Sequence, residues 1–226
     1  MAEMGIQFGT GSQFGTLTGW AAQSPTITVA EQRANALGEA GDEVAFKLYD
    51  KRTDVSQEFV ASNAATAPTV PANIGDLLGG NIVTGISIST SATDFVKMTL
   101  TGHNHDANAH AALRKVAHGI SLSKAFGAID FLGGTAGAAA TVESSTCDIS
   151  CQHEDIQTED GAHAAGQNYD ARIQVTVTWH GVPTTPAASG WSVTSVETKP
   201  NPQGFLQTTV TAEKALTLPA PSGNAT

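Results

Sequence analysis

An internal repeat is the feature of this 226-residue sequence that most restricts its fold. Residues 24–60 align without a gap with residues 144–180, and residues 82–103 align in the same order with residues 192–213. The alignment keeps the phase of the apolar positions and matches Ser24 with Ser144, Thr26 with Thr146, Gln32 with Gln152, Tyr49 with Tyr169, Asp50 with Asp170, Arg52 with Arg172, Val55 with Val175, Val83 with Val193, Thr84 with Thr194, Phe95 with Phe205, Thr99 with Thr209 and Thr101 with Thr211. Such a repeat predicts two diverged copies of one structural unit.

Each copy has the pattern of a small β unit, with short runs of alternating apolar and polar residues bounded by turn residues. In the first copy the predicted strands are Thr26–Ala30, Val44–Tyr49, Val55–Ala61, Ile82–Ser89 and Phe95–Thr101. Polar turns are expected at residues 50–53 and 90–94. In the second copy the predicted strands are Thr146–Cys151, Ala171–Trp179, Trp191–Thr198 and Phe205–Ala212.

The segment between the copies has a helical pattern. Asp106 is a candidate N-cap for a helix over Ala107–His118, and Gly119 would end it. The expected fold class is therefore mainly β, a sandwich or barrel built from two tandem diverged β units with one central α-helix. The expected division of the chain is an N-terminal arm (1–19), β unit 1 (20–105), helix and linker (106–139), β unit 2 (140–217) and a C-terminal tail (218–226).

Composition argues against several functional classes. Charged residues make up 14% of the chain, whereas soluble domains have roughly 25%. The net charge is −10 with only eleven Lys and Arg residues, so binding of nucleic acid through a basic patch is not expected. A surface rich in Ser, Thr and Ala instead favours contact with other subunits. No signal peptide or membrane-spanning run is expected.

The two cysteines, Cys147 and Cys151, lie within one predicted strand. Four residues of strand span roughly 13 Å, which is too far for a disulfide. Free thiols in a reducing compartment are expected.

His103, His105 and His110 are the candidate metal ligands, since imidazole binds Zn²⁺ and other transition metals. Their spacing matches no established metal motif, and no Glu stands beside paired helical histidines as a general base. The preferred interpretation is a polar elbow whose imidazoles bind backbone groups, so neither a cofactor nor catalysis is predicted.

Residues 16–60 and 82–103 carry a resemblance to a known family. They contain Thr16-Leu-Thr-Gly, then Glu39-Ala-Gly-Asp-Glu-Val-Ala, then Tyr49-Asp-Lys-Arg-Thr, followed by an alternating strand and the hairpin Ile82–Thr101. This order of segments resembles small virion proteins of tailed bacteriophages, especially tail tube subunits.

The resemblance implies a β-sandwich whose subunits form rings, either trimeric or hexameric, that stack into a tube. DNA would pass through the tube without specific binding, and the partners would be copies of the chain and other virion proteins. The protein would then reside in the virion, after assembly in the cytoplasm of a bacterial host. The residues expected to make assembly contacts are Phe8, Phe14, Trp20, Pro68 and Pro71.

Three alternatives remain at this point. The first is a capsid decoration or neck protein. The second is a soluble β-sandwich module that binds a sugar or a protein ligand. The third is a metal enzyme that uses the histidines.

Overall fold

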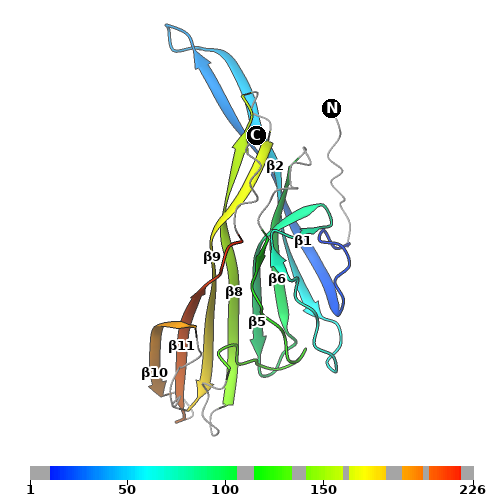
Figure 1. Ribbon diagram of the computed structural model, residues 1–226, viewed down its shortest axis with the longest axis vertical. Helices are drawn as coiled ribbons and strands as arrows, with labels where there is room; N and C mark the ends of the chain where they lie inside the picture. The colour runs from blue at the N-terminus through cyan, green and yellow to red at the C-terminus, as the bar shows by residue number, and fades with distance from the viewer. Residues whose placement is uncertain are drawn as a thin grey trace.

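The computed structural model describes residues 11–105, 115–133, 141–159, 163–181, 190–200 and 204–219. The regular structure of these residues consists of β-strands alone (Figure 1). The strands are β1 (Trp20–Leu37), β2 (Glu43–Ala61), β3 (Asn73–Ile74), β4 (Leu77–Leu78), β5 (Asn81–Ser91), β6 (Lys97–His105), β7 (Val116–Ala117), β8 (Thr141–Gln157), β9 (His163–His180), β10 (Ser192–Pro200) and β11 (Leu206–Ala215).

One large sheet contains most of the strands, in the order β1-β2-β6-β5-β8-β9-β11-β10. Every neighbouring pair is antiparallel, β4 adds to β5, and β3 pairs with β7 in a separate two-stranded sheet. The mainly β prediction is therefore confirmed. Among the described residues, the large sheet is open at both edges, with β1 at one edge and β10 at the other.

The two halves of the sheet have the same arrangement. The first four long strands lie in the order β1-β2-β6-β5, and the last four lie in the order β8-β9-β11-β10. The register also repeats, because Gln32 pairs with Tyr49 in the first half and Gln152 pairs with Tyr169 in the second. A bulge in each half interrupts the pairing at the position before that glutamine. The segments that align in the sequence thus occupy matching places in the sheet.

The predicted turn at residues 50–53 is wrong, because β2 continues through it as a single strand with a bulge. The matching bulge in β9 contains Asp170, whose φ of 47° lies in the left-handed region that Asp tolerates better than most residues. The turn of the first hairpin lies instead at Gly38–Asp42, where the Gly38 N–H donates to the Asp42 carbonyl at 2.8 Å.

The predicted central helix is not seen. Residues 107–114 lie outside the described part of the chain, and the end of the predicted helix is a strand, because Val116 and Ala117 pair with Ile74 and Asn73. Val116 is completely buried. A β-branched residue fits a pleated strand well, and its tertiary contacts outweigh a helical periodicity that rested on a few residues.

The hydrophobic core lies against one face of the sheet. Apolar side chains alternate along the strands and form one buried cluster, which includes Ile86, Met98, Leu100, Ile149, Val175, Val177 and Trp179. Residues outside the large sheet, from three segments of the chain, complete the same cluster, among them Phe14, Val70, Ile74, Ile129 and Leu132. The opposite face is rich in hydroxyl side chains, with Thr176 beside Thr211 and Thr178 beside Thr209 at hydrogen-bonding distance. One face is therefore covered by loops and the other is polar.

Residues 11–19 belong to this covering layer. Phe14 is 1% exposed and meets Phe59 edge-on, with 6.4 Å between the ring centroids. The Gln13 N–H donates to the Gln57 side chain at 2.8 Å, and the Asn81 amide donates to the Gln13 carbonyl at 2.7 Å. This part of the expected arm packs onto its own subunit, while residues 1–10 lie outside the described residues.

We expect Phe14→Ala to lower the free energy of unfolding by about 3–5 kcal/mol, because it removes a ring that fills the core. Urea denaturation followed by tryptophan fluorescence measures this change. Phe205→Ala is the matched control, since Phe205 is 64% exposed and its removal should change stability by no more than about 0.5 kcal/mol. Equal effects for the two variants would show that residues 11–19 do not contribute to the core.

Candidate functional site

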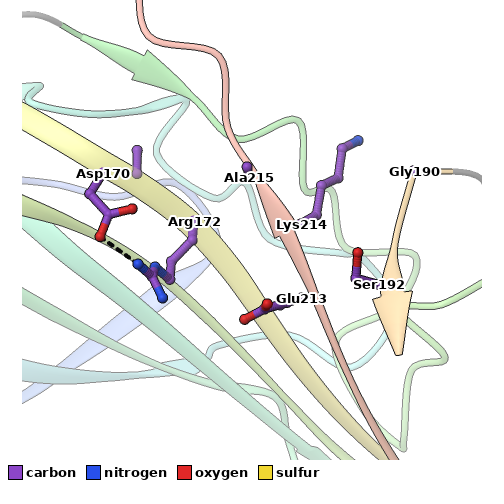
Figure 2. A pocket seen from close by; sticks show the side chains of 8 residues that line it. Asp170, Arg172, Gly190, Ser192, Glu213, Lys214 and Ala215 are labelled. Atoms are coloured by element: carbon purple, nitrogen blue, oxygen red, sulfur yellow. Dashed lines mark hydrogen bonds and ion pairs between the residues drawn. The ribbon is translucent and has the colours of Figure 1, made fainter. Parts of the chain in front are cut away.

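A cavity of about 460 Å³ lies beside the start of β10 (Figure 2). Its lining residues come from β9, β10, β11 and the segment before β10: Asp170, Ala171, Arg172, Gly190, Ser192, Glu213, Lys214 and Ala215. Asp170 and Arg172 form an ion pair, and Glu213 and Lys214 add one charge of each sign (Figure 2). Its described lining residues include no histidine or cysteine.

The candidate metal ligands are only partly brought together. His103 and His105 are buried at the end of β6, with 5.0 Å between their ring centroids. His153 of β8 also reaches this place, and its ring centroid lies 4.6 Å from that of His103. His110 lies outside the described residues. In the described ranges, no group of three His, Cys, Asp or Glu side chains is arranged to hold a metal ion.

His153 was not predicted for this cluster. Its position depends on the pairing of β5 with β8, which joins the two halves of the chain, whereas the sequence patterns predicted contacts within each half only. The repeat gives no signal for this contact, because it aligns His103 with Glu213 and His153 with Arg33.

The expected assembly residues lie within the subunit. The Trp20 indole N–H donates to the Thr69 carbonyl at 2.9 Å, and Pro68 is buried against Gly19. The Pro71 carbonyl accepts a hydrogen bond from His118, and Phe14 is in the core. Phe8 lies outside the described residues. The four described residues therefore make contacts within their own subunit, and their proposed contacts with other subunits stay a prediction.

The cysteines are free thiols on β8, as no disulfide joins them. Burial raises the pKa of both Cys147 and Cys151 to about 12. Neither thiol forms a reactive thiolate near neutral pH, so a nucleophilic role is not supported.

In the described part of the chain, no strand covers the two outer edges of the large sheet (Figure 1). All nine residues of β10 are exposed, and Val193 and Val196 are 40% and 54% exposed. At the other edge, Val29 of β1 is 46% exposed. An open edge presents unpaired backbone N–H and C=O groups and is a template for another strand.

The interior of the sheet shows how such edges pair. The repeat aligns β10 with β5 and β1 with β8, and β5 and β8 pair with each other inside the chain. Ile86 and Ile149 face each other in this pair and are 2% and 1% exposed. Their aligned residues at the open edges are Val196 and Val29. The same two positions are therefore buried where a neighbouring strand is present and exposed where it is absent.

The hairpin of β1 and β2 extends beyond the rest of the sheet, at the top of Figure 1. Among the residues that the structure describes, β6 pairs with β2 from Arg52 onward and not with the part before it. The projecting part exposes Val44, Phe46 and Leu48, and the Arg33 guanidinium lies 4.5 Å from the centroid of the Phe46 ring. A two-stranded ribbon with exposed apolar residues is marginally stable alone, so it is a second surface suited to contact with another molecule.

Comparison with known proteins gives no match, either to a protein-family model or to a curated protein sequence. Among the described residues, no helix has the length and apolar character needed to cross a bilayer.

His118 is expected to make the stability of the fold depend on pH. Its Nε2–H donates to the Pro71 carbonyl at 2.6 Å, and its Nδ1 accepts from the Ile120 N–H at 3.0 Å. Burial lowers the pKa of His118 below its usual value of 6.5, although the Pro71 bond and Asp76 oppose this shift. The neutral ring therefore contributes stability above pH 6.5, and that contribution is lost as the pH falls through the lowered folded-state pKa.

We expect wild-type stability to decrease between pH 7.5 and pH 5 by more than that of a His118→Gln variant. Gln retains a donor for the Pro71 carbonyl but does not titrate. Urea midpoints measured across this pH range give the comparison. Parallel curves for the two proteins would show that His118 does not contribute to the acid sensitivity.

Proposed function

We propose that this protein is a non-enzymatic structural subunit that joins copies of itself edge to edge into rings, and that the rings stack into the tube of a bacteriophage tail. The observation that carries this proposal is the state of the sheet edges. Both outer strands are open, and each aligns with a strand that is paired inside the chain. A subunit whose two ends match its own internal junction can add further copies without a change of geometry.

Addition of copies with a constant rotation gives a closed ring, and closure removes every open edge. The barrel expected from the sequence is then formed by several chains together. The two halves of each chain, which we infer to be diverged copies, would make a ring with twice as many units as subunits.

The two faces of the sheet support a channel. Loops cover the apolar face, so the uncovered hydroxyl-rich face is the one that can line a lumen. With a net charge of −10 and few basic residues, the protein offers little to hold phosphates. DNA could move through such a lumen without binding to it.

The projecting hairpin supports stacking. Its exposed residues Val44, Phe46 and Leu48 extend past the strands that would form the ring. Contact with an adjacent ring would remove this apolar surface from water. The same features would suit a neck or capsid decoration protein, which differs in forming single rings or patches instead of a tube.

A soluble ligand-binding module is the second candidate, because the cavity beside β10 could accept a small polar ligand (Figure 2). It predicts a monomer at all concentrations and a ligand-dependent rise in melting temperature.

The first experiment is sizing of the purified protein over a concentration series, followed by negative-stain electron microscopy. Rings or tubes are the expected result. A protein that stays monomeric at high concentration, with no rings on the grid, would overturn the proposed function.

We expect Val196→Asp to abolish these assemblies, because it places a charge in an edge that must be buried in the ring. Monomer stability should change by no more than about 0.5 kcal/mol, since Val196 is 54% exposed. Leu77→Asp is the matched control, because Leu77 is equally exposed but lies on β4, away from both outer edges. If Val196→Asp forms as many rings as wild type, β10 is not part of the interface between subunits.

A further inference from the structure

We propose that β10 of one subunit pairs antiparallel with β1 of the next in the register of the internal β5–β8 junction, with Val196 opposite Val29. This inference rests on the proposed function and specifies which edges meet and how they align.

The register follows from the internal junction. There, Gly85, Ile86, Ser87, Ile88 and Ser89 pair in turn with Ser150, Ile149, Asp148, Cys147 and Thr146. Each of these β5 residues aligns with a residue of β10, and each of these β8 residues aligns with a residue of β1. The resulting intermolecular pairs are Ser195 with Ala30, Val196 with Val29, Glu197 with Thr28, Thr198 with Ile27 and Lys199 with Thr26.

The direction of the side chains agrees with this register. Val196 pairs with Val210, and Ile27 pairs with Val55, and both partners are buried in the core. Val196 and Ile27 therefore lie on the core face of their strands, as does Val29, two residues from Ile27. Glu197, Lys199 and Thr28 lie on the polar face. A slip by one residue would bring apolar side chains to the polar face, so the pairing is specified by burial.

Charge complementarity gives independent support. In the internal junction, the rings of His103 and His153 meet at 4.6 Å across the end of the strand pair. The repeat aligns His103 with Glu213 and His153 with Arg33. Glu213 lines the cavity beside β10 (Figure 2), and the side chain of Arg33 is 49% exposed. In the proposed interface, Arg33 of the second copy would enter this cavity and meet Glu213. The two side chains carry opposite charges and attract each other, whereas two like charges at these positions would repel.

Prolines set the length of the pairing. Pro25 and Pro200 align with Ser145 and Thr90, whose hydroxyl groups bond to each other at 2.7 Å in the internal junction. A proline has no N–H to donate to a ladder. The pairing between subunits should therefore end after Lys199 and Thr26, which makes it shorter than the internal one.

A disulfide between subunits tests the register. Paired residues of an antiparallel ladder have Cα atoms about 4.5–5.5 Å apart, within the range that a disulfide bridges. We expect the double variant Val29→Cys/Val196→Cys, oxidised under assembly conditions, to give a ladder of covalent oligomers on a non-reducing gel. Wild type should give none, because its own buried thiols have pKa values near 12.

The matched control is Thr28→Cys/Val196→Cys, in which the two thiols lie on opposite faces. It should assemble but not cross-link. Rings that cross-link through the control pair, or through neither pair, would overturn the inference while leaving the proposed function intact. Absence of rings from wild type would instead remove the proposed function itself.

Charge reversal tests the second contact. Glu213→Lys should weaken ring assembly, and most strongly at low salt, because it places a lysine opposite Arg33. Adding Arg33→Glu to Glu213→Lys should restore assembly, because the two side chains across the interface again carry opposite charges. Glu43→Lys is introduced with Arg33→Glu so that the ion pair within the hairpin is kept with its charges exchanged. Equal assembly of Glu213→Lys and Glu213→Gln at all salt concentrations would exclude the contact.

Discussion

The hydrogen-bonded pairing of β5 with β8 is the interaction on which the rest of the structure depends. It joins two four-stranded halves into one sheet and allows a single apolar face to run across both. Without this pairing, each half would be a separate sheet with two open edges, and the apolar face would be divided between them. The residues at its centre, Ile86 and Ile149, are almost completely buried because the two strands cover each other.

The same pairing explains what is incomplete in a single chain. The sheet ends on β1 and β10, which match the two strands of the junction, and both expose valines at the positions where the junction buries isoleucines. Proteins commonly protect such edges with charge, proline or covering loops. In the paired stretch and its ends, such features are Pro25, Pro200 and the charges of Glu197 and Lys199, while Val29 and Val196 stay accessible. Assembly with further copies is the physical outcome that these edges favour.

The covering loops differ between the two halves, and this difference decides where a cavity forms. In the first half, Gln13 and Phe14 pack against Gln57, Phe59 and Asn81. In the second half, Ser192 and Glu213 line an open cavity, whereas the residues that align with them in the first half, Ile82 and His103, are 1% and 5% exposed. The first half is therefore filled by its own N-terminal segment and by His153 of β8, whereas the described part of the second half provides no equivalent. A neighbouring subunit can fill this space, as the proposed Arg33 contact requires.

The sequence by itself determined the β class, the hairpin of β5 and β6, the free cysteines and the two matching blocks, because alternation and repetition are local properties of the chain. It gave the wrong structure for residues 50–53 and for Val116, where a bulge and a strand pairing depend on partners distant in the sequence. Only the tertiary structure decided that the halves share one sheet, that His153 joins His103, and that Phe14, Trp20 and Pro68 are internal. Those outcomes follow from which strands become neighbours, and burial by a neighbouring strand is not encoded in the periodicity of either strand alone.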